Sequence, residues 1–334
     1  MISYCIIRRT PNRYKISNMN RNIVLMVLYC LIIIFLSCNK SSKNTDNEIV
    51  RDKLWLWGHA AGSHNGVFGF PSGPDGSSIS IADACSYMNI KNCIVVEYNG
   101  IPESGTEATF ADSLSDCEKV GWSAVGANGP LSSFSDHIKS VKTILKLSDD
   151  FPNVTEVMFD DFFTGDKPRV TLNQLIEMRN LLHERDNPMD MWVVIYDFNL
   201  ERYLKDEYLQ YFDVLNFWTW ESKNLDSLET NIVKLRSRVP DKRIVLGCYM
   251  YDYGASKPIS VTSMAAQCQL GLKLLNEGVI EGMVFLASCI CDLDIDAVEW
   301  TREWIAQVGD YRVQDLNLEE IKLWTEQSIK KYDN

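Results

Sequence analysis

The chain has 334 residues, of which 46% are apolar and 23% charged, and this composition is typical of a globular protein with a full-sized core. Its formal net charge of -12 argues against a nucleic-acid partner, because no basic stripe is available to neutralise phosphates. The same charge disfavours a polyanionic substrate, so we expect a neutral one.

An apolar run near the N-terminus predicts a targeting signal. Arg21 precedes the run 23–36, which is shorter than the about 20 apolar residues that a membrane span needs. The small residue before Cys38 resembles the lipobox of bacterial lipoprotein signal peptides, although Phe35 stands where Leu is usual. The resemblance implies that Cys38 is lipidated and becomes the first residue of the mature chain. An uncleaved signal anchor is the alternative; in both cases we expect a membrane-anchored protein of the cell envelope, outside the cytoplasm.

The sequence divides into four segments. Met19 is a natural start for the signal, so residues 1–18 are interpreted as an upstream extension. The tether is rich in Ser, Asn, Lys and Asp and shows no apolar period. We assign 1–37 to the signal peptide, 38–52 to the flexible tether, 53–310 to the folded domain and 311–334 to a C-terminal helical tail.

Short apolar runs alternate with amphipathic stretches along the folded domain. The predicted strands are 54–58, 93–100, 122–125, 157–159, 191–197, 214–221, 243–252 and 282–288. The predicted helices are 79–88, 110–120, 135–147, 172–182, 204–212, 225–239, 263–276 and 295–308. This alternation, with strands apolar on both faces, predicts the α/β class and a single-domain (β/α)₈ TIM barrel. A doubly wound open sheet is the alternative, but no glycine-rich phosphate loop follows the first strand.

Two adjacent carboxylates, Asp160 and Asp161, end the predicted fourth strand. Carboxylates are costly to bury without partners, so two of them at the end of a core strand indicate a catalytic pair. Alternatively, one caps the next helix and the other points to solvent. Adjacent strand residues face opposite ways, so both enter one site only if the strand ends or bulges there. If only one does, the candidate partners are Asp197, Glu221 and Asp252.

The carboxyl ends of barrel strands hold the chemistry of TIM barrels, and here they carry acids and aromatics. Aromatic faces stack on pyranose rings, and carboxylates bind hydroxyls and act on acetals. Each of these residues alone also has a purely structural interpretation, since acids after strands commonly cap the next helix and aromatic residues commonly fill the core. The enrichment predicts an oligosaccharide or polysaccharide site that needs no cofactor. The substrate-binding candidates are His59, Glu97, Tyr98, Asn128, Asp197, Trp218, Trp220, Glu221, Tyr249, Tyr251 and Asp252, and the same strand ends carry His64, Asn99, Tyr196 and Ser288.

An apolar barrel strand ending in Asp-Asp resembles the fourth strand of glycoside hydrolases that act on N-acetylhexosaminides through the substrate's own acetamido group, such as O-GlcNAcase-type barrels. The resemblance covers this strand and the barrel layout. It implies that Asp160 orients and polarises the acetamido N–H and that Asp161 is the general acid/base. Phe162, Phe163 and Thr164 occupy the places of the further acids in the chitinase-type signature.

Two other functions stay open. A metal-dependent phosphodiesterase-like barrel would hold a divalent ion with His59, Glu97 and Asp160, although no cationic cluster for a phosphate is visible. A non-catalytic glycan-binding lipoprotein would keep the aromatic rim without a working acid. Binding without turnover would identify the latter.

The cysteines beyond the tether show neither a CxxC pair nor the His-rich spacing of a metal cluster. Several lie in apolar runs, where a free cysteine behaves as a small hydrophobe. We therefore expect no metal and mostly buried thiols, with at most one disulfide if the compartment is oxidising. These cysteines are Cys85, Cys93, Cys117, Cys248, Cys268, Cys289 and Cys291.

Overall fold

The structure, a computed structural model, describes residues 47–67, 69–71, 75–98, 100–125, 134–163, 165 and 168–332. The predicted signal run 23–36, Cys38 and most of the tether lie outside the described residues, as do Asn99 and Asn128. Within the described part of the chain, no helix combines the length and the apolar character needed to cross a membrane.

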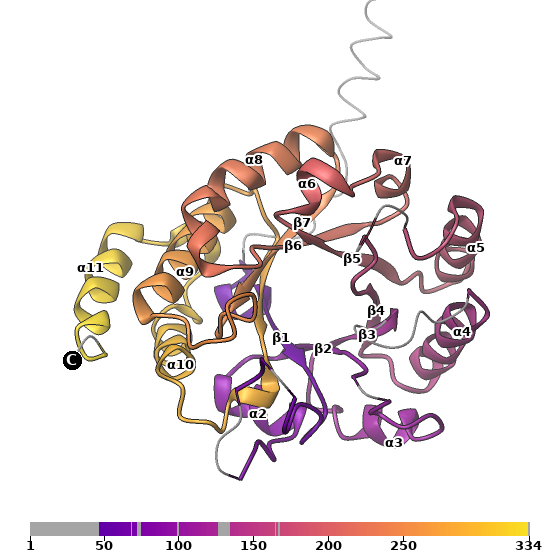
Figure 1. Cartoon of the computed structure of the whole chain (residues 1–334), viewed down its shortest axis with the longest axis horizontal. Helices are drawn as coiled ribbons and strands as arrows, with labels where there is room; N and C mark the ends of the chain where they lie inside the picture. The colour runs from indigo at the N-terminus through magenta and orange to yellow at the C-terminus, as the bar shows by residue number, and fades with distance from the viewer. Residues whose placement is uncertain are drawn as a thin grey trace, which may run out of the picture. The chain divides into compact units, whose positions relative to one another are not determined.

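Parallel strands close into a barrel in the order β1-β2-β3-β4-β5-β6-β7-β8, which confirms the predicted (β/α)₈ fold. Figure 1 shows the helices on the outside of the strands. The strands are β1 (Leu54–Gly58), β2 (Asn92–Val95), β3 (Lys119–Val125), β4 (Val154–Phe159), β5 (Asp190–Tyr196), β6 (Val214–Trp218), β7 (Arg243–Tyr249) and β8 (Gly282–Leu286). Neighbouring strands pair in parallel throughout, and β1 pairs with β8 to close the barrel.

The helices begin at polar caps that the sequence provides. Ser80, Thr171 and Ser260 each accept a hydrogen bond from a backbone N–H in the first turn of the helix that follows. The helices are α2 (Ile81–Met88), α3 (Glu107–Asp112), α4 (Phe134–Asp150), α5 (Leu172–His183), α6 (Asn199–Arg202), α7 (Asp206–Leu209), α8 (Leu228–Arg238), α9 (Val261–Asn276), α10 (Asp296–Val308) and α11 (Leu318–Ile329).

Two predicted helices are wrong in extent. The helix predicted at 110–120 ends at Asp112, because Leu114 and Cys117 are buried by turns and β3 already begins at Lys119. The helix predicted at 204–212 is replaced by the short helices α6 and α7. Four predicted strands also run two or more residues too far, because their last residues lie beyond the ends of β2, β6, β7 and β8.

The compact unit begins at Glu48, so the tether predicted for 38–52 extends too far along the chain. Val50 is fully buried, and its backbone N–H donates to the carbonyl of Tyr311 at 2.9 Å. The guanidinium of Arg51 pairs with Asp310 at 2.8 Å. These contacts tie the start of the fold to the segment that follows α10.

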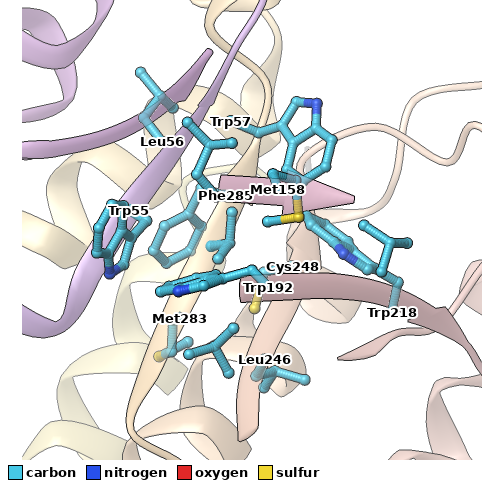
Figure 2. Close-up of a cluster of buried hydrophobic side chains, with 14 of the residues drawn as sticks. Trp55, Leu56, Trp57, Met158, Trp192, Trp218, Leu246, Cys248, Met283 and Phe285 are labelled. Carbon is cyan, nitrogen blue, oxygen red and sulfur yellow. The ribbon is translucent and has the colours of Figure 1, made fainter. Parts of the chain in front are cut away.

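Four tryptophans fill the barrel interior. Trp55 and Trp57 alternate with Leu54 and Leu56 along β1, so the two indoles share the inner face of the strand. Trp55 meets Trp192 of β5 edge to face, with ring centroids 4.9 Å apart. Figure 2 shows Trp57, Met158 and Trp218 gathered in one part of this core. The interior is therefore closed by side chains below the ends of the strands.

Gly247 of β7 makes room for one of these tryptophans, Trp218. A Cβ atom at this position would lie 2.0 Å from Cδ2 of Trp218, a separation that real side chains do not reach. Trp218 is buried, and its ring lies 4.8 Å from that of Tyr249, two residues further along β7. The absence of a side chain at Gly247 thus leaves space for the Trp218 indole at the carboxyl end of β6.

Candidate active site

The carboxyl ends of the strands surround a cavity of about 300 Å³. Its walls are mainly aromatic, and two carboxylates face it. The lining residues are Trp57, His59, His64, Phe70, Tyr98, Asp160, Asp161, Val194, Tyr196, Phe198, Trp218, Trp220, Tyr249, Tyr253 and Leu286. Except for His64 and Phe70, which come from the loop after β1, they belong to strand ends or to the first residues beyond them.

Both members of the Asp pair reach this cavity because β4 ends just before them. The strand stops at Phe159, and Asp161 adopts a left-handed backbone with φ of 48°. Such a conformation is uncommon outside glycine, although Asp tolerates it better than most residues. The turn overrides the alternation of a regular strand, so that Asp160 and Asp161 line the same cavity. Strained residues of this kind are concentrated at functional sites.

Three contacts hold the strained turn. The Asp161 N–H donates to Oδ1 of Asp160 at 2.9 Å, and Nε of Arg169 donates to the Asp161 carbonyl at 2.9 Å. Phe162 and Phe163, which follow the pair, are buried and pack edge to face with centroids 4.9 Å apart. Because both rings point into the core, the backbone before them is fixed and the carboxylates face the cavity.

Tyr196 at the end of β5 binds one of the carboxylates. Its hydroxyl donates to Oδ1 of Asp161 at 2.8 Å. The buried Asn199 positions this tyrosine by accepting from the Tyr196 N–H at 2.8 Å and donating to the Phe163 carbonyl at 2.9 Å. Burial, together with Tyr249 and the two nearby carboxylates, raises the pKa of Tyr196 well above 10. The phenol therefore stays protonated and acts as a hydrogen-bond donor to Asp161.

Two histidines on the β1 side of the cavity are neutral. Nε2 of His59 accepts from the Trp57 indole N–H at 3.2 Å, which leaves the ring proton on Nδ1. Burial, and secondarily the neighbouring His64, lowers the pKa of His59 well below 6.5. Burial lowers the pKa of His64 to about 4. Neither imidazole carries a charge at neutral pH, so neither ring balances the charge of the carboxylates.

Four polar atoms in the cavity wall have no hydrogen-bond partner among the described residues. They are Nδ1 of His59, Nε2 of His64, Nε1 of Trp218 and the hydroxyl of Tyr253, and all four side chains are buried. Buried polar groups in folded proteins almost always have partners, and an unpaired one costs about 1–3 kcal/mol. Groups from the loop after β1, from β6 and from the loop after β7 thus offer hydrogen bonds at the cavity.

Seven of the predicted site residues line the cavity, namely Asp160, Asp161, His59, Tyr98, Trp218, Trp220 and Tyr249. Asn128 lies outside the described residues. The other described candidates do not line this cavity. They are Glu97, Asp197, Glu221, Tyr251 and Asp252.

Those acids brace loops or face solvent. Asp197 accepts from the Trp220 N–H and from Asn224 Nδ2, both at 3.2 Å, and Asp252 accepts from the Ser222 and Ala255 N–H groups at 3.1 and 2.9 Å. These are the capping roles that acids after strands commonly take. Glu221 pairs with Lys223 at 2.6 Å. Glu97 is exposed at the surface, and partial desolvation of its carboxyl, together with the nearby charge of Glu107, raises its pKa.

Tyr251 is buried beside the cavity, with its ring 5.2 Å from that of Tyr253. Tyr253 takes the place in the wall that was expected for Tyr251. On a regular strand, tyrosines at 249, 251 and 253 would all share one face, so the sequence carries no signal that favours Tyr253 over Tyr251. The difference arises because β7 ends at Tyr249. Phe70 and Phe198 also line the cavity, but they lie on loops and carry no sequence signal that links them to it.

The set predicted for a divalent ion does not form. Among the residues that the structure describes, one group of three or more His, Cys, Asp or Glu has its ligand atoms within 4.8 Å of one another, and it consists of Cys85, Cys93 and Cys117. The hypothesis that His59, Glu97 and Asp160 hold a metal is therefore wrong. The imidazole of His59 is already engaged by Trp57, and Glu97 does not line the cavity.

Comparisons with known proteins support the fold. No known protein family and no characterised protein sequence matches the chain. A glucosidase from Croceicoccus marinus is similar in structure, with a TM-score of 0.51 and 14% identity over 77% of this chain and 68% of that chain. Active domain 2 of a thermostable chitinase from Pyrococcus furiosus has a TM-score of 0.48, with 13% identity over 72% of this chain and 85% of its own. At 14% identity, the similarity to the glucosidase shows a shared fold and nothing finer.

Proposed function

We propose that the chain is a glycoside hydrolase that acts on a neutral or N-acetylated glycan. Asp161 is the general acid/base in this proposal, and Asp160 is the orienting or polarising carboxylate. The observation that carries it is the left-handed turn at Asp161, which brings two adjacent carboxylates into one aromatic-walled cavity. Paired carboxylates beside a sugar-binding surface are the usual machinery of glycosidic bond hydrolysis.

The cavity wall suits a hydroxyl-rich ligand with apolar faces. Trp220 and Phe198 are exposed at 36% and 42%, so their rings are accessible for stacking on a sugar. The unpaired atoms of His64, Trp218 and Tyr253 supply hydrogen bonds that a ring of hydroxyl groups can satisfy. At about 300 Å³ the cavity lies at the small end of ligand sites, which favours a short stretch of glycan.

The environments of the two carboxylates support different roles. Asp160 is only 4% exposed, and it accepts the Asp161 N–H, so its position is fixed. Asp161 is partly exposed, and its Oδ1 accepts the Tyr196 hydroxyl. The more accessible carboxyl can approach the oxygen of a scissile bond, as a general acid must. The buried one is suited to holding a polar group of the substrate, such as an acetamido N–H.

A panel of aryl glycosides tests the proposal directly. The panel includes an N-acetylglucosaminide and simple hexosides, and the full chain is assayed for release of the phenol. Cleavage of the N-acetylated member alone would support a polarising role for Asp160. Absence of turnover together with measurable glycan binding would overturn the hydrolase and favour the non-catalytic glycan-binding alternative.

Removing the accessible indole should weaken substrate binding. Trp220→Ala is expected to raise KM about 3- to 10-fold with little change in kcat, because one stacking contact is worth about 0.5–1.5 kcal/mol and is made equally in ground and transition states. Tyr311→Ala is the matched control, since this aromatic is 39% exposed and does not line the cavity. Equal KM values for the two variants would argue against a stacking role for Trp220.

We also propose that Cys38 carries a lipid that anchors the barrel to the membrane of the cell envelope, outside the cytoplasm. The apolar run 23–36 and the small residue before Cys38 support this anchor. In a bacterial host, the wild-type chain is expected to incorporate an alkyne-labelled fatty acid and to fractionate with membranes, whereas Cys38→Ser does neither. Retention of the variant in the membrane at full-length mass would instead support an uncleaved signal anchor.

A further inference from the structure

Three buried cysteines come together between the barrel and its helices, away from the cavity. Cys85 lies on α2, Cys93 on β2, and Cys117 in the turn just before β3. Their exposed fractions are 4%, 0% and 7%. Cys93 alternates along β2 with Ile94, so its thiol points toward α2, which Figure 1 shows beside the first strands. Two consecutive elements and a turn further along the chain thus contribute one thiol each to a single point.

The separations between the sulfurs match a metal site. All three Sγ atoms lie within 4.8 Å of one another, and those of Cys93 and Cys117 are 3.8 Å apart. For a metal–sulfur bond of about 2.3 Å, three sulfurs in a plane around one ion lie about 4 Å apart. The side chains therefore need only small rotations to coordinate an ion at their centre. The thiols are free, so none of them is used in a disulfide.

The donor set selects the kind of ion. Thiolates are soft ligands that favour Cu(I) and Zn(II) among common metal ions. Structural zinc sites are almost always four-coordinate, and within the part of the chain that the structure describes no fourth His, Cys, Asp or Glu joins this group. A soft ion that accepts three ligands fits better. We propose that Cys85, Cys93 and Cys117 bind one Cu(I) ion in three-coordinate geometry.

Binding would fasten α2, β2 and the start of β3 to one another. Cysteines coordinate as thiolates, so uptake of the ion releases protons and becomes tighter as pH rises. An ion that binds the folded chain alone also stabilises it by mass action. Neither effect involves the cavity, so this site stands independently of the proposed hydrolase.

Anaerobic titration of the full-length chain with Cu(I), in competition with a chromogenic Cu(I) chelator, measures the site. The expected result is one tightly held Cu(I) per chain and, by X-ray absorption, three sulfur neighbours at about 2.3 Å. Cys117→Ser should lower the affinity by at least about 100-fold, more than the loss of an outer-shell contact costs. Cys268→Ser is the matched control, because this cysteine is equally buried, on α9, and lies outside the group.

Several results would overturn the copper site. Peptide mapping that finds a Cys93–Cys117 disulfide in the purified chain would leave too few thiols. If the chain with all three cysteines changed to serine bound Cu(I) as tightly as the wild type, the copper would bind at another site. Tighter binding of Zn(II) than of Cu(I) in the same competition would exclude the three-coordinate assignment. The X-ray absorption measurement uses the wild-type chain, so it decides the question even if a serine variant fails to fold.

Discussion

Asp161→Asn is expected to lower kcat for the cleaved aryl glycoside by about 10²- to 10⁴-fold, the contribution that a positioned general acid/base makes. The substitution keeps the shape of the side chain, and Oδ1 can still accept the Tyr196 hydroxyl. What the variant loses is the proton that the carboxyl exchanges with the glycosidic oxygen. KM should change little, because the aromatic wall that binds the sugar is untouched. Steady-state kinetics on the best substrate of the panel provide the measurement.

Asp197→Asn serves as the matched control for this variant. Asp197 also directly follows a barrel strand, but it accepts backbone and amide hydrogen bonds and does not line the cavity. The kcat of Asp197→Asn is expected to stay within about threefold of the wild-type value, because the substituted side chain does not line the cavity. If Asp161→Asn retained full kcat while Asp197→Asn lost it, the acid/base assignment would be wrong and the carboxylate after β5 would be the better candidate.

Asp160→Asn tests whether Asp160 acts on the acetamido group of the substrate or on a feature that all sugars share. If Asp160 polarises an acetamido group, the loss in kcat should be much larger for an N-acetylglucosaminide than for a simple hexoside. An equal loss on both substrates would show that Asp160 acts on a feature common to all sugars. The backbone contact with the Asp161 N–H can be kept by the amide oxygen of Asn, so the turn itself should survive the change.

The barrel could be predicted from the sequence because its signals are local and repeated. Each strand is a short apolar run bounded by polar residues, and an amphipathic stretch follows almost every one. The errors lie where local patterns mislead. Leu114 and Cys117 are spaced like residues on one face of a helix, yet turns bury them. The residues after β2, β6 and β7 continue the apolar pattern of the strands although they already belong to loops.

The cavity was predictable only in part, because loops and backbone conformation decide which side chains enter it. The sequence places Asp160 and Asp161 at a strand end, but it does not show the positive φ at Asp161 that turns both inward. Acids after strands look alike in sequence whether they cap a loop, as Asp252 does, or face a ligand. Phe70 reaches the cavity from a loop, where no periodicity applies.

The cysteine group shows the same limit more strongly. Cys85, Cys93 and Cys117 lie on two different elements and a turn, with none of the short spacings that mark thiolate sites. The parallel pairing of β2 with β3 and the packing of α2 on their outer face bring the thiols together. Each cysteine alone is indistinguishable from a small core residue. Only the closed barrel makes the group visible.

The N-terminal half of β4, away from the Asp160–Asp161 turn, holds a carboxyl group with a pKa near neutral, that of Glu156. Glu156 is 6% exposed, and burial raises the pKa of its carboxyl from 4.5 to about 7, against the opposing effects of the Thr155 hydroxyl and of Lys119 and Arg243. Asp190 acts in the same direction as burial. The folded chain therefore binds this proton more tightly than the unfolded chain. Stability that depends on the proton is complete below about pH 4.5 and is lost as pH rises through about 7.

Glu156→Gln should remove this dependence. The gap between a pKa of 4.5 and one of about 7 corresponds to about 3 kcal/mol. At pH 4 the protonated Glu and the Gln are nearly isosteric and both neutral, so the two chains should have similar free energies of unfolding. At pH 8.5 the wild type buries a charge that the variant lacks. The variant is then expected to be more stable by about 3 kcal/mol, as measured by urea unfolding at both pH values.

Glu118→Gln controls for the general effect of removing an acid from this negatively charged chain. Glu118 is exposed and pairs with Lys91 at 2.7 Å on the surface, and exposed pairs of this kind are worth at most about 1 kcal/mol. The free energy of unfolding of Glu118→Gln should therefore stay close to that of the wild type at both pH values. A stability difference for Glu156→Gln that is the same at pH 4 and pH 8.5 would mean that the Glu156 carboxyl has the same pKa in the folded and unfolded chains. The charges of Lys119 and Arg243 and the Thr155 hydroxyl would then balance burial.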